Sequence, residues 1–140
     1  MRRDLGAVAL GGAAGTLARD GSVRAFPVGA GTFPTTILVV NLLASFLLGA
    51  ALARLDERSH PGRALPEALR PLLVAGFVGG LGTLSAIVVD AALLVDAGRS
   101  DTALAYVAAT VAGGLAAVAA GLRAGGWHAF SPPMPEEDEL

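Results

Sequence analysis

Four stretches of this 140-residue chain contain no charged side chain, and they determine its fold class. The stretches cover residues 5–18, 25–53, 71–89 and 102–122. A helix needs about 20 apolar residues to cross a bilayer core of about 30 Å, and three of the stretches approach or exceed that length. Only 16% of the residues are charged, against about 25% in a typical soluble domain. We therefore predict an all-α membrane protein with four transmembrane helices.

One transmembrane domain over residues 1–125 contains all four predicted helices. The first charge-free stretch is short, and we expect burial of Arg19 against protein to lengthen it. A secretory signal peptide is the alternative for this stretch, although Asp4 interrupts its basic start. The remaining residues, 126–140, are rich in proline and glutamate, which predicts a disordered acidic tail. The predicted spans cover about residues 5–24, 34–54, 68–96 and 100–123.

The arginines are distributed unevenly between the two sides of a four-span arrangement. Four spans place both termini and the middle loop on one side, with seven arginines, and leave three on the other. Cytoplasmic loops carry an excess of lysine and arginine. We therefore expect both termini, and the tail, to lie in the cytoplasm and the protein to lie in the cell membrane. The seven arginines are Arg2, Arg3, Arg54, Arg58, Arg63, Arg70 and Arg123.

Composition argues against several classes of function. The chain has no cysteine, which excludes a disulfide framework. With only two histidines as further zinc ligands of the usual kind, the sequence also argues against the usual zinc sites. It has no basic domain that would bind nucleic acid. It also lacks a nucleophile–base pair and a phosphate-binding loop. We therefore expect neither an enzyme nor a nucleic-acid partner.

Polar side chains inside the apolar spans are the candidate functional residues, because each is costly in hydrocarbon unless it is paired or faces a cavity. Asn41 is the strongest candidate, since its amide needs several hydrogen-bond partners at mid-membrane depth. For a single hydroxyl the alternative is a bond to a carbonyl of its own or a neighbouring helix. The candidates are Asn41, Ser45, Thr83, Ser85, Asp90, Tyr106 and Thr110.

A glycine cluster interrupts the third predicted span. Residues 76–83 read GFVGGLGT and place four glycines where a continuous helix is expected. Each glycine costs a helix interior about 1 kcal/mol relative to alanine, so the cluster predicts a broken helix. A break buried in protein exposes backbone groups that bind ions. The alternative is a glycine face that lets another helix approach closely, and the spacing alone leaves both open.

Motifs in the four spans match one family of small membrane proteins. Gly12, Gly15 and Arg19 fit a Gly-x-x-Gly-x-x-x-Arg signature in the first span. The second span, TTILVVNLLASFLLG, is similar to the segment around that family's pore asparagine and places this role on Asn41. The third span, GFVGGLGTLSAI, aligns with the pattern GFxGGxTTFSTF.

The fourth span adds a last correspondence. Tyr106 and Thr110 fall where the family has a tyrosine and a serine four residues apart. With these motifs the chain resembles, over residues 5–122, the small dual-topology fluoride channels of the Fluc or CrcB family.

The resemblance implies an antiparallel dimer, surrounded by lipid, that exports fluoride down its electrochemical gradient and so lowers its toxicity in the cytoplasm. It also implies one structural Na⁺ at the dimer centre, held by backbone carbonyls of Gly79 and Gly82. Because fluoride is small and strongly hydrated, its pore must replace water with hydrogen-bond donors and positive ring edges. The implied pore residues are Asn41, Ser45, Thr83, Ser85, Tyr106 and Thr110.

The chain departs from the family pattern within the third span. Leu84 and Ile87 stand where the family has phenylalanines, Gly82 and Ala86 replace threonines, and Asp90 replaces a glutamate. Aliphatic side chains offer no positive ring edge to an anion. Together with the biased arginines, this favours one half of a heterodimer with a paralogue over a homodimer.

Two other functions remain open from the sequence. One is an assembly subunit with a degenerate pore. The other is a small four-span exporter that couples substrate to protons through Asp90, an acid within the third predicted span. Arg19 is interpreted as a structural residue at the interface.

Overall fold

The computed structural model describes residues 2–55 and 69–126, and their regular structure is entirely helical. The all-α prediction is therefore confirmed for this part of the chain. The predicted acidic tail and most of the middle loop lie outside it. The elements are α1 (Arg2–Ala25), α2 (Thr35–Leu55), η2 (Pro71–Val78), α3 (Gly79–Leu81), α4 (Leu84–Asp96) and α5 (Ser100–Ala124).

Three helical segments within the described residues are long and apolar enough to cross a membrane. They are Thr35–Leu55, Pro71–Asp96 and Ser100–Ala124. The 24-residue α1 is equally long, but it is not among the segments that are also apolar enough. The charged residues Arg19, Asp20 and Arg24 lie in its last turns. The protein is thus a membrane protein by composition, and a fourth span through α1 stays a prediction.

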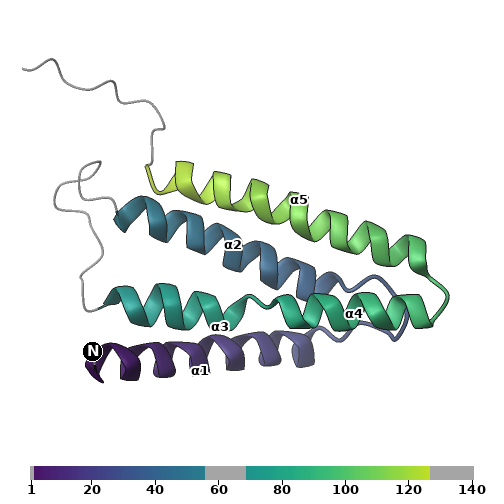
Figure 1. The fold of residues 1–140 in the computed structure, drawn as a ribbon, viewed down its shortest axis with the longest axis horizontal. Helices are drawn as coiled ribbons and strands as arrows, with labels where there is room; N and C mark the ends of the chain where they lie inside the picture. The colour runs from purple at the N-terminus through teal and green to yellow at the C-terminus, as the bar shows by residue number, and fades with distance from the viewer. Residues whose placement is uncertain (1, 56–68, 127–140) are drawn as a thin grey trace, which may run out of the picture.

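The helices form two closely packed pairs that lie side by side (Figure 1). α2 packs along α5, and α1 packs along η2 and α3. α4 leaves the second pair and contacts α5. α2 and α5 run in the direction opposite to α1 and the η2–α3–α4 unit. Between the pairs, Val40, Ala44 and Leu81 form a small buried cluster that holds α2 against the third span.

Glycines bring the helices of each pair into backbone contact. A side chain on Gly49 of α2 would collide with the backbone of Val118 in α5, and one on Gly121 would collide with that of Phe46 in α2. In lipid, apolar surfaces gain nothing from leaving water, so close van der Waals packing of small residues is what holds helices together. The close packing of α2 on α5 therefore depends on having glycine, with no side chain, at these two positions.

The glycine cluster of the third span both packs against another helix and contains a break, the two interpretations that its sequence left open. Gly76 and Gly80 face the backbone of α1, where a Cβ on either would collide with main-chain atoms. The helix continues through both, so the break is narrower than the cluster predicted. It falls at Gly82 (φ −79°, ψ 143°) and Thr83 (φ −149°, ψ 125°), which are extended.

η2 has π-helical hydrogen bonding over eight residues from Pro71 to Val78. This element was not predicted, because a π-helix has the same apolar composition as the α-helix expected there. Pro71 occupies the first turn, where its missing N–H would have no helical partner anyway. The start of the third span therefore lies at Pro71.

The glycine contacts predict a test of the α2–α5 pair. Gly49→Val places a branched side chain against the α5 backbone, and such overpacking costs about 1–3 kcal/mol. We expect a lower midpoint of thermal unfolding in detergent, followed by far-ultraviolet circular dichroism. The matched control is Gly6→Val, since a Cβ on Gly6 meets nothing within 4 Å. Equal midpoints for the two variants would contradict this packing.

Candidate functional site

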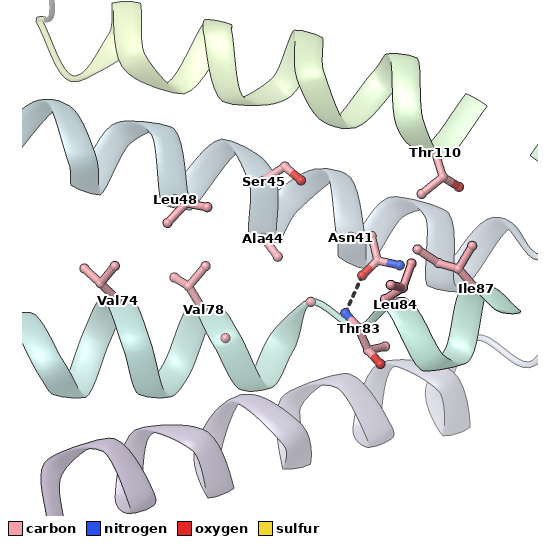
Figure 2. Close-up of a pocket in the computed structure, with 12 residues that line it drawn as sticks. Asn41, Ala44, Ser45, Leu48, Val74, Val78, Thr83, Leu84, Ile87 and Thr110 are labelled. Carbon is pink, nitrogen blue, oxygen red and sulfur yellow. Dashed lines mark hydrogen bonds between the residues drawn. The ribbon is translucent and has the colours of Figure 1, made fainter. Parts of the chain in front are cut away.

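A cavity of about 300 Å³ lies where the break in the third span faces α2. Its walls come from one face of α2, from η2 and the break, from the first turn of α4, and from Thr110 of α5. Figure 2 shows Asn41 between α2 and the break, with Ser45 farther along α2. None of the residues that line the cavity carries a charge. The site is therefore a neutral cavity with a few polar groups.

Asn41 holds the break through one hydrogen bond. Its Oδ1 accepts a bond of 2.9 Å from the backbone N–H of Thr83 (Figure 2). In a continuous α-helix this N–H would donate to the carbonyl four residues earlier, that of Gly79. The amide thus replaces a helical bond and leaves the Gly79 carbonyl without its usual donor.

The same bond fixes the orientation of the Asn41 amide. The Thr83 N–H can only donate, so the amide oxygen must face it and the nitrogen must point away. Asn41 is only 8% exposed, and its Nδ2 has no hydrogen-bond partner among the residues that the structure describes. A buried donor without a partner costs about 1–3 kcal/mol. Such a donor in a cavity is suited to a ligand that accepts hydrogen bonds.

Four hydroxyl groups lie in or next to the cavity, and their hydrogen bonds differ. Thr83 Oγ1 and Ser85 Oγ form a bond of 2.8 Å with each other. Thr110 Oγ1 donates to the carbonyl of Tyr106, 2.8 Å away on its own helix. Ser45 lines the cavity. Of the predicted polar residues, Asn41, Ser45, Thr83 and Thr110 thus meet in the cavity, and Ser85 adjoins it through Thr83.

Tyr106 does not line the cavity; it is fully buried between α4 and α5. Its hydroxyl donates to Asp90 Oδ2 at 3.3 Å, and its ring meets that of Phe33 edge to face with centroids 5.6 Å apart. The sequence did not single out Phe33, because no local motif links it to Tyr106. Asp90 lies outside the cavity and joins α4 to α5 through Tyr106.

The two positions at which the family pattern has phenylalanines differ in their surroundings. Leu84 lines the cavity and is 74% exposed on the outside of the chain. Ile87 also lines it but packs against the buried cluster around Tyr106. Arg19 is half-buried on α1 and does not line the cavity. The cavity rim is therefore aliphatic at both positions.

Backbone oxygens are the available ligands for a metal ion. The described residues contain no group of three or more His, Cys, Asp or Glu side chains that could hold one. Gly79 and Gly82 lie at the cavity wall beside the break, and Gly79 has open space where a side chain would be. Because Thr83 N–H donates to Asn41, the Gly79 carbonyl lacks its usual helical donor.

Comparisons with known proteins find one matching family and several similar proteins. The family model described as "CrcB-like protein, Camphor Resistance (CrcB)" matches residues 6–122. The chain is 43% identical over 120 residues to the fluoride-specific ion channel FluC 2 of Symbiobacterium thermophilum, covering 83% of this chain and 92% of that protein. It is 39% identical over 127 residues to the fluoride-specific ion channel FluC of Cereibacter sphaeroides, covering 87% and 94%.

The Asn41–Thr83 bond predicts faster amide exchange when the acceptor is removed. Asn41→Leu keeps the branched shape of the side chain but leaves Thr83 N–H without its acceptor. We expect the exchange protection of this amide to fall by up to about tenfold, the factor that corresponds to a bond of about 1.4 kcal/mol. Hydrogen–deuterium exchange of the detergent-solubilised protein measures it. Ser45→Ala is the control in the same cavity, and unchanged protection in Asn41→Leu would contradict the role of the amide.

Proposed function

The chain belongs to the CrcB family, and we propose from this that it is a subunit of a fluoride-specific ion channel in the cell membrane. The channel would let fluoride leave the cytoplasm down its electrochemical gradient and so lower its toxicity. The observation that carries this proposal is the buried Asn41 Nδ2, an amide donor without a partner among the described residues, on a side chain that lines an uncharged cavity.

The chemistry of the cavity favours an anion over a cation. Conduction of fluoride requires donors that replace its hydration shell, and Nδ2 brings two N–H groups. No carboxylate lines the cavity to repel an anion or to neutralise a cation. Asp90, which the exporter alternative requires, lies outside the cavity and accepts a bond from Tyr106. The geometry therefore supports a channel better than a proton-coupled exporter.

The cavity wall of one chain is open to a second subunit. Gly79 is exposed beside the break, and Leu84 projects from the rim with most of its surface uncovered. We infer an antiparallel, dual-topology dimer in which a second wall closes the path. α1 would be the first of four spans, supported by its glycine contacts with η2 and α3. Both termini would then lie on the arginine-rich cytoplasmic side.

A structural Na⁺ at the dimer centre fits the break. The carbonyls of Gly79 and Gly82 would be its ligands in this chain, and a crossing break in the second subunit would complete a cage of oxygens. The charge of the ion would make the dimer centre more favourable for an anion. The support for this site is the Gly79 carbonyl, which loses its helical donor to Asn41.

The partner is proposed to be a paralogue. Leu84 and Ile87 place aliphatic groups at the cavity, so the positive ring edges would come from a subunit with phenylalanines at these positions. The seven-to-three arginine bias favours one fixed orientation for this chain, with the paralogue in the other. An assembly subunit with a degenerate pore is the second candidate, and the same aliphatic rim favours it.

Asn41→Asp tests the anion role of the amide. The new side chain keeps an oxygen to accept from Thr83 N–H but loses both N–H donors, and its carboxylate repels an anion. We expect fluoride efflux from proteoliposomes to fall by at least about a hundredfold, because a lost charge-assisted bond of about 3 kcal/mol has this effect.

The control for this substitution is Ser22→Ala, which removes a hydroxyl that bonds its own helix on α1, outside the cavity. Size-exclusion chromatography checks that each variant keeps the assembly of the unmodified protein. Wild-type efflux from a correctly assembled Asn41→Asp channel would favour the assembly subunit instead.

Reconstitution tests the heterodimer. We expect weak fluoride efflux from the chain alone, strong efflux with a paralogue of opposite arginine bias, and a gain for the lone chain in Leu84→Phe/Ile87→Phe. A fluoride electrode outside the proteoliposomes measures each rate. Strong efflux from the unmodified lone chain would overturn the requirement for a partner.

A further inference from the structure

A second groove, of about 260 Å³, lies between α2 and η2 near the end of the molecule where α2 ends. We call it the α2–η2 groove. Its walls are apolar and include Leu47, Ala51, Leu73 and Phe77, and Arg54 stands at its end, next to the last residue of α2. The groove therefore combines apolar walls with one guanidinium group at its end.

The α2–η2 groove and the Asn41 cavity lie on different faces of α2. Successive helical residues are rotated by about 100°, so Asn41 and Ser45 share one face, whereas Leu47, Ala51 and Arg54 share another, about 120° away. A second subunit that covers the cavity rim need not cover the groove. This part of the surface can therefore face membrane lipid.

Among the described residues, the two ends of the molecule differ in their balance of basic and acidic side chains. Within residues 4–55 and 69–126, the end where the α2–η2 groove opens has more basic than acidic side chains, whereas the two kinds balance at the other end. At the groove end the charged residues are Arg54, Arg70, Arg123 and Asp4. At the other end they are Arg19, Arg24, Arg99, Asp20, Asp96 and Asp101.

Arg54 is the charged group best placed to act on a ligand in the groove. It is exposed, and the described residues give it no ion pair. Its guanidinium matches the geometry of a phosphate. In lipid, apolar walls alone give little preference for one chain over another, because acyl chains are as apolar as the side chains. Selectivity must therefore come from the charge.

We propose that the α2–η2 groove binds an anionic phospholipid, with an acyl chain between Leu73 and Ala51 and the phosphate on Arg54. Such a lipid would occupy the leaflet on the arginine-rich side of the membrane, where anionic lipids are attracted by basic side chains. It would fill the space between α2 and η2 and so support the half of the third span that precedes the break. The proposal does not depend on which ion the protein conducts.

Native mass spectrometry of the full-length assembly tests this site. The probe is an equimolar mixture of phosphatidylglycerol and phosphatidylcholine, and the readout is the number of each lipid retained per chain. We expect preferential retention of phosphatidylglycerol. Arg54→Gln should lower its affinity about fivefold, the factor for about 1 kcal/mol per arginine near an anionic lipid. Ala51→Phe, which fills the groove, should lower retention of phosphatidylglycerol as well.

Two matched variants serve as controls. Arg123→Gln removes an exposed arginine at the same end, and Ala120→Phe adds a ring to an exposed position of α5, both away from the groove. Equal retention of the two lipids by the unmodified protein would overturn the proposal, as would equal losses in Arg54→Gln and Arg123→Gln. If Ala51→Phe dissociates the dimer and leaves the lipid count unchanged, a second subunit fills the groove and the proposal is wrong.

Discussion

The hydrogen bond from Thr83 N–H to Asn41 Oδ1 is the interaction on which the candidate site depends. It substitutes a side chain on α2 for a bond within the third span, so α3 can end and α4 can begin inside the bundle without a buried N–H left unpaired. The bond also turns Nδ2 away from Thr83 and releases the carbonyl of Gly79. One amide therefore links the break, the free donor and the free backbone oxygen.

Glycine packing provides the frame in which that bond forms. Gly49 and Gly121 bring α2 and α5 into backbone contact, and Gly76 and Gly80 do the same for the third span and α1. Such contacts fix each helix along its axis, because a shift of one residue would place a side chain where only a glycine fits. The break can then meet Asn41 in one register, which a bundle held by larger, adaptable side chains would not ensure.

The sequence predicted the elements better than it predicted their contacts. Apolar stretches between charges indicated helices whose bounds lie close to those of α2 and α5, because this signal is local. The position of the break within the glycine cluster depends on contacts between helices, which the local sequence does not show. Gly76 and Gly80 stay helical because α1 packs on them, and Gly82 is the glycine of the cluster that is extended. Asn41 was recognisable as a costly amide, but its partner is a backbone N–H that no motif marks. The Phe33–Tyr106 contact was missed for the same reason.

The number of free hydrogen-bond donors limits how much of an anion's hydration one chain can replace. Nδ2 of Asn41 has two free N–H groups. Thr83 and Ser85 share one bond, so only one of their two hydroxyl hydrogens remains free, and that of Thr110 is given to a carbonyl. Ser45 adds one hydroxyl on the cavity wall, and Leu84 and Ile87 add no donor. Burying an ion without replacing its hydration is costly, so a dehydrated fluoride beside this wall needs further donors or ring edges. The proposed second subunit could supply them, and the exposed rim at Leu84 is where it can approach.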